Sequence, residues 1–187
     1  IGPGLFESVY ETLLAEALRE RIAGPTFRTY LCDDVAGAEI GGAVKNVLAI
    51  ACGVVDGKGL GQNARAALIA RGFAEMTRFG LANGAKRETL AGLSGLGDLV
   101  LTCSSTSSRN FSLGKGIGEG RSVSDFMVDR RTVVEGAFTA PVLARLAREL
   151  QIDMPIVEAV DALIAGRANV DEALGALLSR SAKAEAV

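Results

Sequence analysis

Apolar and polar residues follow a helical period along most of this chain. Between residues 5 and 22, apolar side chains recur at i, i+1, i+4 and i+5, which places them on one face of a helix. The same analysis predicts two longer helices over residues 36–55 and 63–81, the second ending at Asn83-Gly84. No convincing strand ladder is present, so the pattern predicts an all-α fold.

Three further helices are predicted toward the C-terminus. An apolar stripe beginning at Phe138, with Pro141 in its first turn, indicates the first of them. Pro155 is expected to start the second. Asn169 and Glu172 have the spacing of a capping box ahead of the third.

A segment rich in glycine, serine and threonine, residues 88–120, interrupts this pattern. It predicts irregular backbone with short helices around residues 98–103, and irregular backbone inside a helical protein often carries function. Within it, Gly114-Lys115-Gly116 lacks the spacing and the Ser/Thr of a P-loop. We expect a loop there, with backbone amides available to an anion.

Residues 59–64, GLGQNA, match the GxGxxA form of a dinucleotide-binding fingerprint. A working fingerprint follows a strand, opens a helix and has an acidic residue about 20 residues further on. Here a predicted helix precedes the motif and no acidic residue lies at that distance. A turn between two helices is therefore the favoured interpretation.

Composition narrows the classes of function. The 187 residues are 49% apolar, carry a net charge of −2 and contain no tryptophan, which argues against a nucleic-acid partner. Histidine is absent and the three cysteines lack CxxC spacing, so no metal site is expected.

The odd cysteine count and the lack of a secretory leader fit the cytoplasm. The longest apolar run, residues 40–55, is shorter than the ~20 residues of a membrane span.

Lys45 and Asn46 interrupt the most hydrophobic stretch of the chain, residues 41–55. A buried ammonium group is costly unless it is paired or loses its proton. One interpretation is a lysine at a helix edge, whose stem covers apolar surface while its amine reaches water. The other is a desolvated amine that exchanges a proton with a substrate near neutral pH. The residues alone leave both open.

Two further groups are candidates for chemistry. Asp98, in the sequence GLGDL, suits a helix N-cap and also an acceptor for a substrate hydroxyl or for Lys45. Ser108, Arg109 and Asn110 follow a serine-rich loop. A guanidinium fork with hydroxyl and amide neighbours is suited to binding phosphate, and the alternative is an ordinary solvated loop.

Four stretches, taken in order, resemble the C-terminal domain of NAD(P)-dependent glycerol-3-phosphate dehydrogenase. They are residues 33–76, 92–110, 133–140 and 154–160. The resemblance extends from Gly24 to the C-terminus. It implies a multi-helical substrate domain of the glycerol-3-phosphate dehydrogenase or phosphogluconate dehydrogenase-like type. In the family such a domain packs against a Rossmann domain, and no βαβ unit is found in this sequence.

The resemblance also implies residue roles. Lys45 would be the catalytic proton acceptor when sn-glycerol 3-phosphate is oxidised to dihydroxyacetone phosphate, and the proton donor in the reverse reduction. The implied substrate-binding residues are Lys45, Asn46, Asp98, Thr102, Ser108, Arg109 and Asn110. The implied NAD or NADP contacts are Arg109, Val133 and Glu135.

Residues 1–23 do not resemble this family. They are similar to the opening of small GxxExxY-type proteins through Gly4, Glu7 and Tyr10, and otherwise read as an amphipathic helix. We therefore expect an N-terminal helical extension over residues 1–23 and a substrate domain over residues 24–187.

Two functions are expected from these observations. The first is the substrate half of an oxidoreductase, with little or no turnover as an isolated chain because most cofactor contacts are missing. The alternative is a non-catalytic helical module that binds a phosphorylated metabolite or self-associates as a homo-oligomer.

Overall fold

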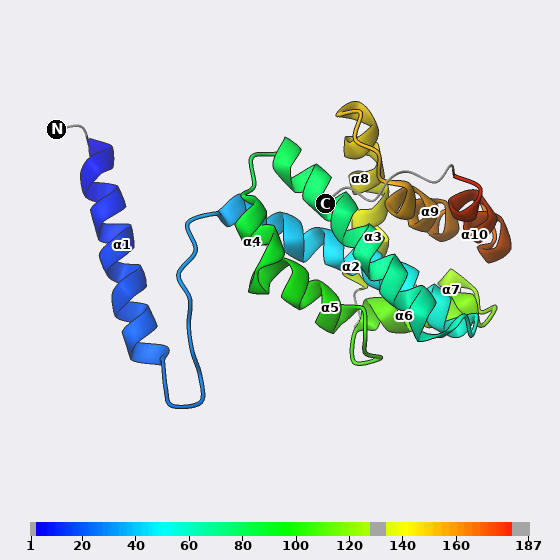
Figure 1. Cartoon of the computed structure of the whole chain (residues 1–187), viewed down its shortest axis with the longest axis horizontal. Coiled ribbons are helices and arrows are strands. Elements are labelled where there is room, and N and C mark those ends of the chain that lie inside the picture. The colour runs from blue at the N-terminus through cyan, green and yellow to red at the C-terminus, as the bar shows by residue number, and fades with distance from the viewer. Residues whose placement is uncertain (1–2, 128–133, 181–187) are drawn as a thin grey trace. The chain divides into compact units, whose positions relative to one another are not determined.

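The computed structural model describes residues 3–127 and 134–180, and every regular element in these ranges is a helix (Figure 1). The predicted all-α class is thus confirmed. The chain divides into two units, Ile1–Val35 and Ala36–Val187.

The first unit holds one long helix, α1 (Pro3–Ile22). A turn follows it, closed by two backbone hydrogen bonds between Gly24 and Phe27. Helix α1 confirms the helix predicted over residues 5–22. Its large apolar side chains from Val9 to Leu18 are more than half exposed, with Tyr10 at 73%.

The second unit is built around α2 (Val35–Gly57), in which thirteen residues are buried. This helix and α3 (Gly61–Ala82) match the two predicted long helices within two residues at each end. The remaining helices are α4 (Arg87–Ala91), η1 (Leu93–Gly97), α5 (Asp98–Thr102), α6 (Arg109–Gly118), α7 (Val123–Met127), α8 (Glu135–Glu149), α9 (Pro155–Ile164) and α10 (Val170–Leu178). The last three follow one another in space, with α9 packed against both α8 and α10.

By length and hydropathy alone, α2 is the one helix in the described part of the chain that could cross a membrane. Of its most apolar 18-residue window, 61% is buried inside the protein. Burial on this scale is typical of the core helix of a globular domain.

Glycines allow α6 to approach the α2 backbone directly. A Cβ atom placed on Gly114 would lie 1.9 Å from the Ile50 carbonyl oxygen, and one on Gly53 would lie 2.1 Å from that of Phe111. No side chain fits between backbones this close. The expected loop at residues 114–116 is therefore wrong, because these glycines lie inside α6 and serve helix packing.

The short helix expected around residues 98–103 is present as α5. The irregular backbone expected over the rest of residues 88–120 is wrong for most of its length, since α4, η1 and α6 occupy it. Glycine and serine favour helices weakly, but packing in the folded chain overrides that preference here. Gly114 shows the reason, because its close contact with the Ile50 carbonyl oxygen joins two helices far apart in the sequence. By contrast, the predicted turn between two helices is confirmed, with a positive φ of 69° at Gly59, although α3 already begins at Gly61.

The C-terminal helices agree with the sequence in two of three cases. Pro155 opens α9, and the capping box of Asn169 and Glu172 is formed at the start of α10. The third helix, α8, begins at Glu135, so Pro141 is its seventh residue and does not lie in the first turn as predicted. Hydrogen bonds between Asn46 of α2 and Glu135, and between Asn110 of α6 and Gly136, stabilise this earlier start.

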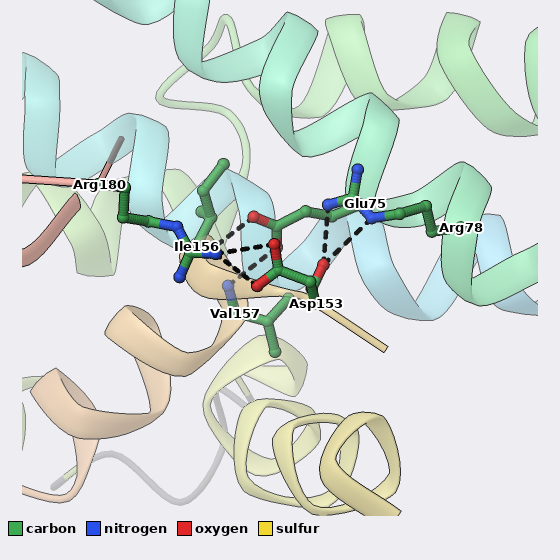
Figure 2. Close-up of polar contacts among 6 residues, drawn as sticks. All are labelled: Glu75, Arg78, Asp153, Ile156, Val157 and Arg180. Carbon is green, nitrogen blue, oxygen red and sulfur yellow. Dashed lines mark hydrogen bonds and ion pairs between the residues drawn. The ribbon is translucent and has the colours of Figure 1, made fainter. Parts of the chain in front are cut away.

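A buried carboxylate anchors α9 to α3. Glu75 is 1% exposed, and its two oxygens accept hydrogen bonds from the Ile156 and Val157 amides at 2.8 and 3.2 Å (Figure 2). These amides belong to the first turn of α9, where helical partners are lacking. Burial raises the pKa of Glu75 to about 7, against the lowering effect of the two amides and Arg78.

Two arginines hold Asp153, which lies two residues before the start of α9. Arg78 donates to the Asp153 carbonyl oxygen at 2.7 and 3.1 Å. Arg180 donates to both oxygens of the Asp153 carboxylate at 2.6 and 2.7 Å (Figure 2). The turn before α9 is thereby tied to α3 and to the end of α10.

Replacing Gly114 with alanine tests the close contact of α6 with α2. We expect Gly114→Ala to lower the free energy of unfolding by about 1–3 kcal/mol, the scale of overpacking. This loss runs against the gain of about 1 kcal/mol that alanine brings to a helix interior. Gly175→Ala in α10 is the matched control, since nothing lies within 4 Å of its added Cβ. Urea unfolding of both variants is the measurement, and equal stability would contradict the contact.

The stability of the fold should fall as pH rises through the titration of Glu75. Its pKa is about 7 in the folded protein against an ordinary 4.5, so the folded chain binds a proton that the unfolded chain has lost in this window. The resulting loss is on the order of 3 kcal/mol between these two pH values. Urea unfolding at pH 5, 6, 7 and 8 should show a flatter profile for Glu75→Gln. Parallel profiles for parent and variant would contradict the assignment.

Candidate active site

The candidate site is centred on an ion pair between α2 and α5. The Lys45 amine donates directly to Asp98 Oδ2, and the two side chains are 20% and 34% exposed. One turn along α5, the Thr102 hydroxyl donates to the Asp98 carbonyl oxygen at 2.7 Å and lies 3.3 Å from Asp98 Oδ1. Lys45, Asp98 and Thr102 therefore form one polar group.

The position of Asp98 differs from the N-cap expected on sequence grounds. Gly97 is the N-cap of α5 and makes no side-chain cap bond, while Asp98 is the first helical residue. Its carboxylate accepts from Lys45 rather than capping its own helix. A negative charge in the first turn still suits the helix dipole.

Lys45 combines features of both sequence interpretations. Its neighbours on α2 are buried, yet its own side chain keeps a fifth of its surface in contact with water. The amine is held by a carboxylate rather than extended freely into solvent. A paired and partly accessible amine of this kind is suited to exchange a proton with a bound hydroxyl.

Asn46 connects this group to two other helices. Its Nδ2 donates to Glu135 Oε2 at 3.0 Å, and its Oδ1 accepts from Asn110 Nδ2 at 3.0 Å. Glu135 is the first residue of α8, and Asn110 lies in the first turn of α6. The residue after Lys45 is thus bonded to the residue that follows Arg109.

The start of α6 presents a charged side chain to solvent. Ser108 is the N-cap, and its hydroxyl oxygen accepts from the Phe111 amide at 3.3 Å. Arg109 follows it as the first helical residue and is exposed. Among the described residues it forms no ion pair, so its guanidinium is available to an anion.

The predicted site residues are thus distributed over neighbouring elements. The structure joins Lys45, Asp98 and Thr102 in one group and bonds Asn46 to Asn110 and Glu135. Val133, predicted as a cofactor contact, lies outside the described residues. Among the described residues no cluster of three metal-ligating side chains occurs.

Sequence reasoning missed one participant, Gly136 at the second position of α8. Its amide donates to Asn110 Oδ1 at 2.9 Å. A Cβ atom there would lie 2.5 Å from the Asn46 carbonyl oxygen, so only glycine allows this approach. The glycine that follows Glu135 was the available signal, but nothing in the local pattern shows which helix it contacts.

Comparison with known proteins gives a consistent result. Residues 34–175 match the family model described as NAD-dependent glycerol-3-phosphate dehydrogenase C-terminus. The glycerol-3-phosphate dehydrogenase (NAD(P)+) of Erythrobacter litoralis is 70% identical over 170 residues, which is 91% of this chain and 51% of that protein. The enzyme of the same name from Novosphingobium aromaticivorans is 71% identical over 168 residues, covering 90% and 51%.

A solved structure agrees with these sequence relatives. The crystal structure of glycerol-3-phosphate dehydrogenase from Coxiella burnetii matches with a TM-score of 0.85 at 42% identity, covering 90% of this chain and 52% of that one. The chain spans about half the length of the curated relatives it matches. It belongs to the family of NAD-dependent glycerol-3-phosphate dehydrogenase C-terminal domains.

Proposed function

We propose that this chain supplies the substrate side of a dehydrogenase that interconverts sn-glycerol 3-phosphate and dihydroxyacetone phosphate with NAD or NADP. The observation that carries the proposal is the Lys45–Asp98 pair, partly open to solvent on a helix that is otherwise mostly buried. Family membership supplies the reaction class. We assign this role to residues 24–187 and regard residues 1–23 as an extension.

In the proposed reaction Lys45 moves the proton. Its neutral amine accepts the proton of the substrate C2 hydroxyl during oxidation, and its ammonium returns a proton to the carbonyl oxygen during reduction. Asp98 holds the amine in place by accepting its hydrogen bond, and Thr102 braces Asp98 from the next turn. A bound nicotinamide would accept or donate the hydride.

Arg109 is the proposed anchor for the substrate phosphate. Its guanidinium can form two parallel, charge-assisted bonds to phosphate oxygens, and it is exposed and unpaired among the described residues. Ser108, Asn110, Asn46 and Thr102 complete the proposed substrate contacts. The hydrogen bond between Asn46 and Asn110 supports a single site, because it joins the segments of Lys45 and Arg109.

The residues present could contact one edge of a dinucleotide cofactor but do not form a complete binding site for it. Arg109 is free to contact a dinucleotide phosphate, and Glu135 keeps one carboxylate oxygen beyond its bond to Asn46. The described residues contain helices only and no dinucleotide-binding sheet. We therefore expect little or no turnover from these 187 residues by themselves. Separately, we propose that the chain lies in the cytoplasm, as its cysteine content suggests.

Binding of glycerol 3-phosphate to this chain is the first test. Calorimetric titration should show binding to the parent chain, and Arg109→Ala should reduce it at least about tenfold, the scale of one charge-assisted hydrogen bond. Arg145→Ala is the matched control, because it removes an exposed arginine of α8 whose ion pair, among the described residues, is with Glu149. Absence of binding to the parent would leave the non-catalytic helical module, alone or as a homo-oligomer, as the better account.

Substitution of Lys45 tests the proton transfer in a protein that joins this chain to a dinucleotide-binding domain. Lys45→Ala should lower the rate by about 10²-fold or more, the scale of one acid–base group. Lys45→Arg should not restore it, because guanidinium stays protonated. Steady-state reduction of dihydroxyacetone phosphate is the measurement. Unchanged turnover in either variant would refute the role of Lys45.

A further inference from the structure

A continuous chain of hydrogen bonds begins and ends on the first two residues of α8. It runs from the Glu135 carboxylate to the Asn46 amide, on to the Asn110 amide and back to the Gly136 backbone N–H, with donor–acceptor distances of 2.9–3.0 Å. Asn46 and Asn110 are only 9% and 7% exposed. The chain therefore connects α8, α2 and α6 through two buried asparagines and ends on the exposed Glu135.

The two ends of this chain determine the orientation of both asparagine amides. A backbone N–H can only donate, so Asn110 must present its Oδ1 to Gly136 and its Nδ2 to Asn46. Asn46 must then offer Oδ1 to Asn110, which leaves its Nδ2 facing Glu135. An ionised carboxylate can only accept, so the sequence of donors and acceptors is complete. Turning either amide over would place like groups opposite each other.

The backbone contact at Gly136 leaves little room for another arrangement. A Cβ atom on Gly136 would lie 2.5 Å from the Asn46 carbonyl oxygen and 2.8 Å from Asn110 Oδ1. The start of α8 is therefore pressed against α2 and against the Asn110 side chain. A different rotamer of Asn110 would leave the Gly136 amide unpaired in a buried position.

We propose that Asn110 and Glu135, besides their proposed ligand contacts, act as positioning residues. They fix the Asn46 amide and thereby the spacing of the Lys45, Arg109 and Glu135 turns of α2, α6 and α8. The inference rests on the proposed function for its effect on substrate. Each asparagine amide has two N–H bonds, and the chain uses one of each. The fixed orientation decides where the second Asn46 N–H lies relative to a ligand held by Lys45 and Arg109.

This proposal differs from direct binding of a ligand by each residue in one measurable way. A positioning chain can be broken by one substitution and repaired by a second that restores a donor opposite an acceptor. If Asn46 acts only as a direct substrate contact, restoring a donor at its neighbour cannot improve the affinity. The donor and acceptor pattern at Glu135 and Asn46 allows such a repair to be designed.

Four variants of the 187-residue chain make the test. Asn46→Asp places a carboxylate against the Glu135 carboxylate and should break the chain. Adding Glu135→Gln supplies an amide donor to the carboxylate introduced at position 46 and should repair it. Adding Glu135→Met to Asn46→Asp removes the repulsion and the extra charge but supplies no donor. Asn63→Asp is the control for the substitution itself, because Asn63 is exposed near the start of α3.

Thermal unfolding reports on the chain of hydrogen bonds itself. Asn46→Asp should lower the midpoint by at least about 3 °C, the scale for the loss of one buried hydrogen bond in a protein of this size. The variant with Glu135→Gln should recover most of this loss, and the variant with Glu135→Met clearly less. Equal midpoints for these two double variants would overturn the proposal, because the donor would then make no difference.

Titration with glycerol 3-phosphate reports on positioning. Asn46→Asp should weaken binding about tenfold or more, because it breaks the chain and also removes the second N–H of Asn46. In that background the variant with Glu135→Gln should bind at least about threefold more tightly than the variant with Glu135→Met, because only the former restores the hydrogen-bonded orientation. Equal affinity of the two double variants, while the unfolding midpoint recovers only with Glu135→Gln, would overturn the positioning role and leave Asn46 as a direct substrate contact only. A parent chain that binds no glycerol 3-phosphate would refute the proposed function instead, and the unfolding comparison would still decide whether the hydrogen-bonded chain exists.

Discussion

The proposed chemistry depends on the ion pair between Lys45 on α2 and Asp98 on α5. A charged amine on a mostly buried helix is unfavourable unless a partner replaces the solvation that it loses. Asp98 supplies that partner at the start of a short helix, and both side chains keep part of their surface in water. The pair is therefore held by the protein and still accessible to a small hydroxylated molecule.

The surroundings of this pair are set by contacts between backbones. Gly53 and Gly114 allow α6 to touch α2, and Gly136 allows α8 to do the same at Asn46. With no side chains between them, these helices have little freedom to shift against one another. The short side chains of Asn46 and Asn110 can then bridge three helices. The arrangement of the site therefore depends on glycine at these three contact positions.

Sequence alone predicted the parts of the fold that depend on local pattern. The long helices over residues 36–55 and 63–81, the start at Pro155 and the capping box at Asn169 are confirmed, since apolar period and capping chemistry are readable along the chain. The family was also predicted correctly, because its motifs occur in order. The short helix expected around residues 98–103 is present, but the irregular backbone expected over most of residues 88–120 is wrong, since glycines suggest loops until the partner helix is known.

Candidate residues for the site could be named from the sequence, but the hydrogen bonds between them could not. Lys45 stood out because a charge in an apolar run demands an explanation. Its pairing with Asp98, 53 residues away, was only one of several open interpretations. The bond between Asn46 and Glu135 spans 89 residues, and no local pattern encodes it. Such contacts follow from how the helices pack, which periodicity does not specify.

A crystal structure of this chain with bound glycerol 3-phosphate would test the central claim most directly. The account predicts that one ligand molecule contacts both cations, with its C2 hydroxyl within about 3 Å of the Lys45 amine and its phosphate bonded to Arg109. A ligand whose phosphate lies away from Arg109, or whose hydroxyl cannot reach Lys45 while Arg109 is engaged, would contradict it.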